Sequence, residues 1–310
     1  DLYLTVNTIN NIDCMNKTID QRLQDLREVM RRERLAAFIF PSTDPHQGEY
    51  IPDHWKGREF ISGFNGSAGT AVVTMTSAAL WTDSRYFIAA EEQLRGTEFQ
   101  LMKLKIPGTP TIAEWLGQEI RRANASTEVG IDGMVNSANS VKELIADLRK
   151  EGGVTVRTNR DPLARIWRDR PAMPDNPVEL FPMEYAGESC TSKLQRIRGK
   201  IAAKKADAMV VSALDEIAWL LNIRGCDIEF NPQVISYVVL EQEKCTLFVL
   251  PEKVDAKAAA YLKAQNISVK GYEDVFAYLG GLQGTVLYDG GKVNERLFEA
   301  IRGKSVNAQS

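Results

Sequence analysis

The chain repeats one pattern 171 residues apart: Arg22-Leu-Gln-Asp-Leu-Arg27 returns as Lys193-Leu-Gln-Arg-Ile-Arg198. The apolar segment that follows, Ala37-Phe-Ile-Phe40, returns at the same offset as Ala208-Met-Val-Val211. Self-similarity at a fixed offset indicates a structural unit that is used more than once. We therefore interpret the chain as two copies of one domain.

Each copy opens with an amphipathic helix that leads into a buried strand. In the first copy, Leu23, Leu26 and Met30 recur at helical spacing, which predicts a helix over residues 20–34. The short apolar run that follows, Ala36–Phe40, is typical of a strand buried on both faces. The second copy carries the same succession.

Further strand and helix patterns stand at matching places in the two copies. In the first copy we expect strands at residues 70–74, 79–82, 129–133 and 154–158 and a helix at 137–150. In the second copy we expect strands at residues 235–240, 246–250, 286–290 and near Ser305, with a helix at 292–302. This alternation predicts an α/β fold of two tandem domains, each a mixed β-sheet flanked by helices.

Proline density separates the two copies. Residues 161–189 include five prolines, which interrupt helices and strand ladders and are typical of a linker. The predicted domains are therefore residues 20–160 and 190–310. Residues 1–19 are predicted to be a disordered extension, in which Met15 is the expected natural start.

Composition and charge exclude several classes of function. The net charge of −3 argues against a nucleic-acid-binding surface, which needs clustered basic residues. No apolar run reaches the roughly 18 residues that cross a bilayer, and the first residues lack the pattern of a secretion signal. The four cysteines stand far apart without a CxxC pair, which argues against a disulfide framework and predicts a cytoplasmic protein.

Common catalytic patterns are missing from the sequence. The glycines of Gly63–Gly69 have GxxGxxG spacing and lead into a strand, so they predict a tight turn rather than a phosphate loop. The two histidines, His46 and His54, lie in one loop near several carboxylates. A surface loop that touches another domain or a substrate is a better interpretation than a metal site. We expect no catalytic residue and no metal ligand in this chain.

The segment Trp81-Thr-Asp-Ser-Arg85-Tyr-Phe87 is the most distinctive local feature. A strand ends in a polar turn, a helix is expected over residues 86–94, and Asp83 or Ser84 is expected to cap it. Arg85 would then project at the end of the strand, where α/β sheets commonly bind ligands. The guanidinium either grips a carboxylate or carbonyl of a ligand, or pairs with Asp83 or a glutamate and braces the turn.

A second dense stretch, Asp215–Gly225, is interpreted as a core helix. Ile217, Leu220 and Leu221 give it one apolar face. Asp215 is expected to cap its N-terminus, and Gly225 is expected to end it.

Four longer stretches together resemble one family. They are Ser42-Thr-Asp-Pro-His-Gln-Gly-Glu-Tyr50, Phe60–Thr70, Trp81–Phe87, and Leu214–Gly225 with Asn231-Pro232. From about residue 20 onward, the sequence resembles the N-terminal and middle domains of three-domain aminopeptidase P, an Xaa-Pro aminopeptidase. Both are creatinase N-terminal-like domains. One departure is Ser84, which stands where the family usually has glycine.

This resemblance implies a function for a longer protein. The family removes an N-terminal residue that precedes proline, using two metal ions, usually manganese, held in a third, pita-bread domain. No motif of that domain occurs in this sequence, so the chain is expected to be the non-catalytic front part and inactive alone. Arg85 matches the family's arginine that reaches the substrate peptide, which favours a substrate-binding role.

The resemblance also implies partners. These are a peptide with proline at its second position, the chain's own C-terminal catalytic domain and, in the full-length form, a second copy in a homodimer. The front domains would favour short peptides. The alternative is a peptide- or protein-binding module of an aminopeptidase-like pseudoenzyme. A prolidase or creatinase fits less well, because those enzymes typically carry one front domain.

Overall fold

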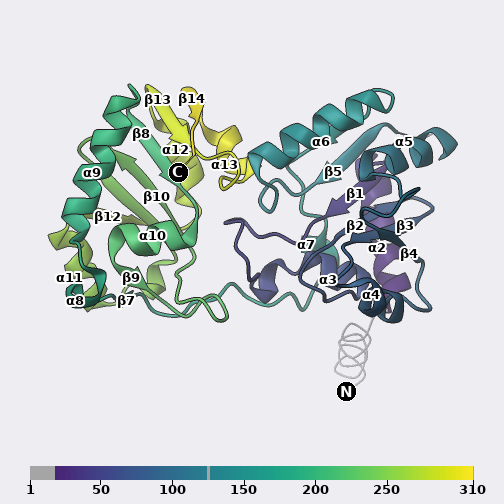
Figure 1. The fold of residues 1–310 in the computed structure, drawn as a ribbon, viewed down its shortest axis with the longest axis horizontal. Helices are drawn as coiled ribbons and strands as arrows, with labels where there is room; N and C mark the ends of the chain where they lie inside the picture. Colours follow the sequence, from purple (N-terminus) through teal and green to yellow (C-terminus); the bar gives the residue numbers. More distant parts are fainter. Residues whose placement is uncertain (1–17, 124–125, 310) are drawn as a thin grey trace, which may run out of the picture. The chain divides into compact units, whose positions relative to one another are not determined.

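The computed structural model describes residues 18–123 and 126–309, which form two compact units (Figure 1). Each unit is built on a six-stranded mixed sheet. The extension predicted at residues 1–19 lies outside the described residues, except for its last two. No helix in the described ranges is long and apolar enough to span a membrane.

The two sheets have the same strand order. The first sheet contains β1 (Ala37–Phe40), β2 (Thr70–Thr74), β3 (Ala78–Thr82), β4 (Phe99–Lys103), β5 (Glu128–Ile131) and β6 (Thr155–Arg157). The second contains β8 (Ala208–Val211), β10 (Ser236–Glu241), β11 (Cys245–Val249), β12 (Ile267–Lys270), β13 (Thr285–Tyr288) and β14 (Lys304–Asn307). Their orders, β4-β3-β2-β1-β5-β6 and β12-β11-β10-β8-β13-β14, correspond strand by strand.

Strand directions correspond as well. In the first sheet β2 is antiparallel to both β1 and β3, and the other three pairs are parallel. In the second sheet β10 is antiparallel to both β8 and β11, and again the other three pairs are parallel. The predicted fold class, two tandem α/β domains with mixed sheets, is confirmed.

Helices cover both faces of each sheet. The first unit contains α2 (Ile19–Glu33), α3 (Gly57–Ser62), α4 (Phe87–Gln93), α5 (Ile112–Ala123) and α7 (Leu163–Ile166). The second contains α9 (Cys190–Ala203), α10 (Leu214–Leu221), α11 (Ala256–Ala264), α12 (Asp274–Gly281) and α13 (Glu295–Ala300). Helix α6 (Ala138–Lys150) follows β5.

Alternate strand residues separate two cores on each sheet. In the first sheet, Phe38 and Leu80 face a core with α2, α3, α4 and α7, while Trp81 points to the other face and contacts Trp115 of α5. In the second sheet, one face packs against α9, α10 and α11, and the opposite face packs against α12 and α13. Each domain is therefore a three-layer α/β/α structure.

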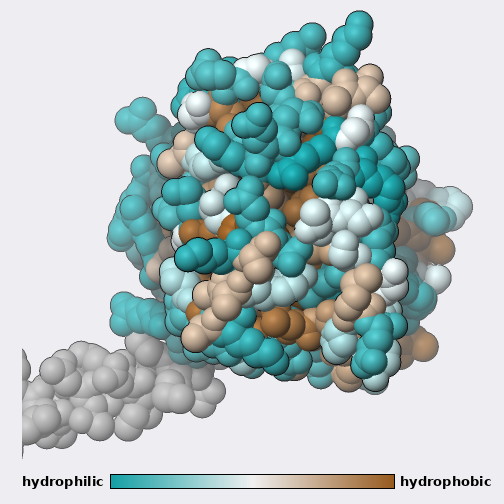
Figure 2. All heavy atoms as spheres, turned by 90° about the vertical axis from the view of Figure 1, so that its left-hand side faces the viewer, coloured by the Kyte–Doolittle hydropathy of each residue, from teal (hydrophilic) through white to brown (hydrophobic). Residues whose placement is uncertain are grey.

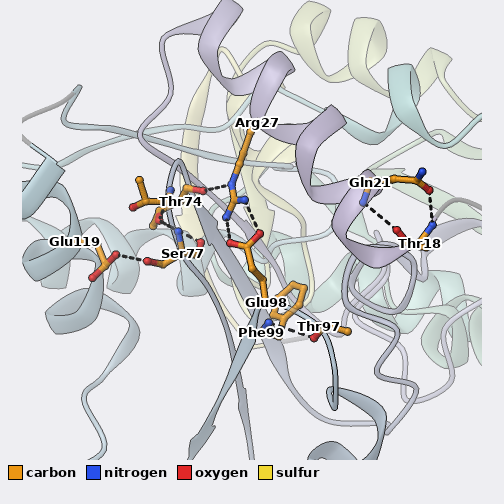
Figure 3. Close-up of polar contacts among 10 residues, drawn as sticks. Thr18, Gln21, Arg27, Thr74, Ser77, Thr97, Glu98, Phe99 and Glu119 are labelled. Atoms are coloured by element: carbon orange, nitrogen blue, oxygen red, sulfur yellow. Dashed lines mark hydrogen bonds and ion pairs between the residues drawn. The ribbon is translucent and has the colours of Figure 1, made fainter.

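One arginine on the first helix of each domain fastens that helix to the sheet. Arg27 Nε donates to the Thr74 carbonyl at 2.9 Å, and its two terminal nitrogens bind the Glu98 carboxylate (Figure 3). The repeated arginine, Arg198, donates to the Glu241 carbonyl at 2.9 Å, at the matching place in the second sheet. The repeat thus preserves a specific helix–sheet contact as well as the hydrophobic pattern.

A capping box begins α2. Thr18 Oγ1 accepts the Gln21 N–H at 3.3 Å, and Gln21 Oε1 accepts the Thr18 N–H at 2.9 Å (Figure 3). Replacing Thr18 with alanine is therefore expected to cost the first domain about 1 kcal/mol of unfolding free energy. The matched control is Ser189→Ala, which removes the N-cap of α9 and should weaken the second domain instead. Hydrogen exchange resolved by domain would measure both, and unchanged exchange in α2 would contradict the prediction.

The compact units differ from the predicted contiguous domains. The first unit comprises residues up to Ser42 with Lys56–Asp132 and Lys142–Ala172, and the remaining residues form the second unit. The predicted linker 161–189 is therefore not a separate segment. Its first part includes α7, and its later part includes β7 (Glu179–Leu180), which pairs with β9 (Ile223–Arg224). Apolar side chains between the prolines, such as Leu163 and Val178, are buried and fix these parts to the two domains.

Candidate functional site

The turn after β3 presents Asp83 and Arg85 at the end of that strand. The Asp83 carbonyl accepts the Tyr86 N–H at 3.0 Å, and Asp83 Oδ1 accepts the Arg85 N–H at 3.1 Å. The Arg85 guanidinium binds the same carboxylate, with Nε 2.9 Å from Oδ1 and Nη2 2.8 Å from Oδ2. The turn therefore holds Arg85 by a two-point ion pair.

The predicted cap of the following helix is wrong. α4 begins at Phe87 rather than Tyr86, Tyr86 is its N-cap residue, and no side chain among the described residues caps it. Asp83 does not reach the helix, because its carboxylate is engaged by the backbone and side chain of Arg85. The Asp83 carboxylate thus stabilises the turn through its hydrogen bonds to Arg85, and it does not cap the helix.

The ion pair between Asp83 and Arg85 is both charged and accessible to solvent. The hydrogen bond from the Arg85 side chain lowers the pKa of Asp83 to about 2, and the carboxylate raises the pKa of Arg85 in return. The Arg85 side chain is 67% exposed. Ion pairs in such exposed positions contribute little to stability. A ligand carbonyl or carboxylate could therefore replace Asp83 as the acceptor at small cost.

The glycine-containing loop before β2 packs beside this turn. The hydroxyl groups of Tyr86 and Ser67 share a hydrogen bond. A Cβ atom on Gly66 would lie 2.4 Å from the Phe64 ring and 2.8 Å from the Tyr86 ring. Gly66 is thus needed for close packing, which supports the prediction of a tight turn over a phosphate loop.

Sequence reasoning missed Arg58, which lies behind the same loop. Arg58 lies in the first turn of α3 and is 7% exposed. Its Nη2 donates to the Gly66 carbonyl at 2.6 Å, and its guanidinium lies over the Phe64 ring. Its Nε and Nη1 have no hydrogen-bond partner in the described part of the chain, and burial lowers its pKa to about 10. A single arginine near a helix start carries no sequence signal of burial, so only the packing reveals it.

The second domain has a different turn at the place of Arg85. β11 corresponds to β3, and after it the chain continues Leu250-Pro-Glu-Lys253, with a short 3₁₀ helix η2 (Pro251–Lys253). Lys253 turns inward, and its Nζ lies 2.6 Å from Asp227 Oδ2, with both side chains fully buried. The fold therefore does not require an exposed charged turn here, which favours a binding role for Arg85.

His46 occupies the core of the second compact unit. Its Nδ1 lies 2.8 Å from the Ser212 carbonyl and its Nε2 lies 2.9 Å from the Tyr272 hydroxyl. Because a carbonyl only accepts, Nδ1 carries the proton, and burial lowers the pKa of the ring. The predicted surface position is wrong for this residue, whereas the predicted contact with another domain is found, because both partners belong to the second copy. The sequence contains no local sign of its partners, which come from distant elements.

Asp44 is buried beside His46. Its Oδ1 accepts the N–H groups of His46 at 2.9 Å and Gly48 at 3.1 Å. Its Oδ2 makes no hydrogen bond to the residues described. These contacts organise the loop backbone around the histidine.

The predicted ends of α10 are also wrong. Asp215 lies within the first turn, after the N-cap residue Ala213, whose side chain cannot cap. The helix ends at Asn222, which adopts the left-handed conformation with φ 52° and ψ 44°, three residues before Gly225. The Asn222 side chain is fixed by Lys193 Nζ at 2.8 Å, and this contact stabilises the unusual backbone.

Two family models match the chain, and both describe a Creatinase/Prolidase N-terminal domain. One matches residues 22–157 and the other matches residues 169–310, so each covers one six-stranded sheet. The chain belongs to the creatinase/prolidase N-terminal domain family. It carries this domain twice, which confirms the resemblance noted from its motifs.

Relatives of these creatinase/prolidase N-terminal domains are Xaa-Pro aminopeptidases. A probable Xaa-Pro aminopeptidase P of Talaromyces marneffei is 41% identical over 87% of this chain and 41% of the relative. Xaa-Pro aminopeptidase 1 of Dictyostelium discoideum is 39% identical over 89% of this chain and 44% of the relative. The chain therefore spans less than half the length of these relatives.

A solved structure shares the fold of the tandem creatinase/prolidase N-terminal domains. It is an X-prolyl aminopeptidase from Caenorhabditis elegans, described as a cytosolic enzyme with a di-nuclear active site. The TM-score is 0.86 at 29% identity, and the match covers 94% of this chain and 50% of that enzyme.

The described residues of these creatinase/prolidase N-terminal domains offer no cluster that fits a metal centre. Within 18–123 and 126–309, no three His, Cys, Asp or Glu side chains gather in a way that would hold a metal ion. His46 has both ring nitrogens engaged by protein groups. No catalytic step can therefore be assigned to a metal on these residues.

Proposed function

We propose that this chain is the non-catalytic front part of a metal-dependent Xaa-Pro aminopeptidase, which removes the N-terminal residue preceding proline. One observation carries the proposal: the tandem domains match 94% of this chain but half of the C. elegans enzyme. Hydrolysis and its two metal ions, manganese in this proposal, belong to a C-terminal catalytic domain of the longer protein. That protein acts in the cytoplasm, and its full-length form is a homodimer.

The front domains serve this reaction by shaping access for the peptide. Arg85 binds the substrate, because its guanidinium is exposed, permanently charged and held by an acceptor that a peptide carbonyl or carboxylate can replace. The hydrogen bond between Tyr86 and Ser67 and the close packing at Gly66 hold the turn in place. The absence of this turn from the second domain supports a binding role specific to the first.

In the longer protein, replacing Arg85 with alanine is expected to lower kcat/KM for Xaa-Pro peptides about 10- to 100-fold. This corresponds to the loss of one hydrogen bond from a charged donor, about 1.5–3 kcal/mol. The matched control is Arg95→Ala, because Arg95 is an exposed arginine just past the other end of α4. Equal kcat/KM for the Arg85 variant and the wild type would rule out the binding role.

If the front domains form a narrow entrance, the rate of hydrolysis should depend on the length of the peptide. In the longer protein, kcat/KM should fall steeply as Xaa-Pro peptides are extended at their C-terminus, because a narrow entrance excludes long chains. Steady-state kinetics on a series of peptides with identical first residues would measure this. A flat dependence on length would contradict gating while leaving the role of Arg85 open to its own test.

A further inference from the structure

An apolar groove of about 420 Å³ lies on the second domain, between α9, α10 and the sheet. Its floor is apolar, and the residues that form it are Ile201, Val211, Leu220 and Leu287. Trp219 stands at its rim and is 40% exposed. Ala308, directly after β14, reaches the same groove.

The apolar lining of the groove differs from the surface of the second domain seen in Figure 2. The face of the second domain seen in Figure 2 is largely hydrophilic, and hydrophobic residues appear on it in small separate patches. A groove with an apolar lining on such a domain is therefore a candidate docking site.

The first domain has the corresponding groove and fills it from its own chain. After β6, the last strand of that sheet, the chain forms α7, which packs against α2, the counterpart of α9. Leu163 of α7 is buried against Gly57, where a Cβ atom would lie 2.6 Å from the leucine Cδ1. Trp167 stacks on Phe60, with ring centroids 4.6 Å apart and planes at 15°.

The walls of the two grooves correspond. Phe60 on α3 and Trp219 on α10 occupy matching places, and each ring lies under a cation from the first helix of its domain. The Arg22 guanidinium lies 4.4 Å from the Phe60 centroid, and Lys193 Nζ lies 4.7 Å from the Trp219 centroid. Arg22 and Lys193 are related by the repeat offset. The second groove thus shares the aromatic wall and the cation that hold α7 in the first, but Glu216, which lines it, stands where the first domain has Gly57.

One difference between the grooves concerns charge. In the first domain, Glu33 pairs with Arg160, just before α7, at 3.0 Å. In the second domain, Lys204 stands at the place of Glu33 and lines the groove together with Lys200 and the acidic Glu216. An occupant of the second groove should therefore carry an acidic residue where the first domain has Arg160.

We propose that this groove binds an amphipathic helical turn of the same protein, entering directly after β14 as α7 enters after β6. The turn presents apolar side chains to the floor, a large apolar or aromatic side chain to Trp219 and a carboxylate to Lys204. The inference rests on the proposed function, because it concerns the segment of the longer protein that follows β14. Such a turn would fix the second domain to the part of the longer protein that follows β14.

A graft tests the groove in the 310-residue chain. Residues 159–168, carrying Arg160→Glu to match Lys204, are joined directly after Asn307 in place of the last three residues. The control graft also carries Leu163→Ser, Ile166→Ser and Trp167→Ser, and the original α7 is untouched in both. Hydrogen exchange of α9 and α10 is expected to be about 10-fold slower with the apolar graft than with the control. Equal exchange in the two grafted chains overturns the proposal.

The longer protein supplies a second measurement. Amides of α9 and α10 should exchange more slowly there than in the 310-residue chain, and Trp219→Ala should reduce that difference. Protection in the longer protein without any effect of the graft overturns the proposal, because another part would then cover the groove. Neither readout uses peptidase activity, so failure here and failure of the proposed aminopeptidase function are distinguishable.

Discussion

Replacing Lys253 with methionine is expected to lower the unfolding free energy of the second domain by about 3–5 kcal/mol. Both side chains of the Lys253–Asp227 pair are fully buried, and the same carboxylate oxygen accepts the Ile235 N–H at 2.7 Å. The other oxygen, Asp227 Oδ1, makes no hydrogen bond within the described ranges. Removing the ammonium would therefore leave a buried carboxylate without a counter-charge. Chemical denaturation, with hydrogen exchange to identify the domain, measures the loss.

Two companion variants sharpen this prediction. Lys103→Met removes an exposed ion pair with Glu91 and should change stability by less than about 1 kcal/mol. The double variant Asp227→Leu/Lys253→Met should be more stable than Lys253→Met alone, since it removes the uncompensated charge. If Lys253→Met costs no more than Lys103→Met, the buried pair does not have the structural role assigned to it.

Replacing His46 with alanine is expected to destabilise the second domain by about 3 kcal/mol or more. The change removes a ring packed 4.6 Å from Tyr237, leaves the Ser212 carbonyl without the His46 donor, and leaves the Tyr272 hydroxyl with Tyr237 alone. The matched control is His54→Ala in the same loop, because His54 is less buried and should cost less. Thermal or denaturant unfolding of the two variants compares them directly.

The same histidine predicts a pH effect. Because burial lowers the pKa of His46, the folded protein keeps the ring neutral, whereas the unfolded chain binds a proton below about pH 6.5. Unfolding then takes up a proton, so this contribution to stability is lost as pH falls, by up to about 1.4 kcal/mol per pH unit. The difference in unfolding free energy between wild type and His46→Ala should shrink by about 1 kcal/mol from pH 6.5 to 5.5. A constant difference would show that His46 titrates normally in the fold.

Much of the fold could be predicted from the repeat. The first helix and first strand of each copy are strongly patterned, and in the first copy their ends were predicted within one residue. The edge strands β4 and β12 were not predicted, because only the first residue of each is buried, so they lack the continuous apolar run of the central strands. An edge strand gains its structure from pairing with a neighbour more than from its own sequence.

The candidate site was predictable in part. The Arg85 turn stands out in the sequence, and the structure shows the pairing with Asp83 that was one of its two predicted alternatives. The absence of this turn from the second domain appears only in the structure. His46 was missed as a buried group because its partners, Ser212 and Tyr272, are far away in the sequence. Arg58 was missed because nothing in the sequence marks its contact with the nearby Gly66 carbonyl. The loop around His46 is polar in sequence, but in the structure His46 is buried in the core of the second compact unit.

The most direct test of the central claim is hydrolysis of an Xaa-Pro peptide, with manganese supplied, by the 310-residue chain and by the longer protein side by side. We expect hydrolysis by the longer protein, none by the 310-residue chain, and no stoichiometric metal bound to that chain. Hydrolysis by the 310-residue chain would contradict the claim that it is non-catalytic. A longer protein that binds Xaa-Pro peptides without cleaving them would contradict the aminopeptidase function and favour a peptide-binding pseudoenzyme.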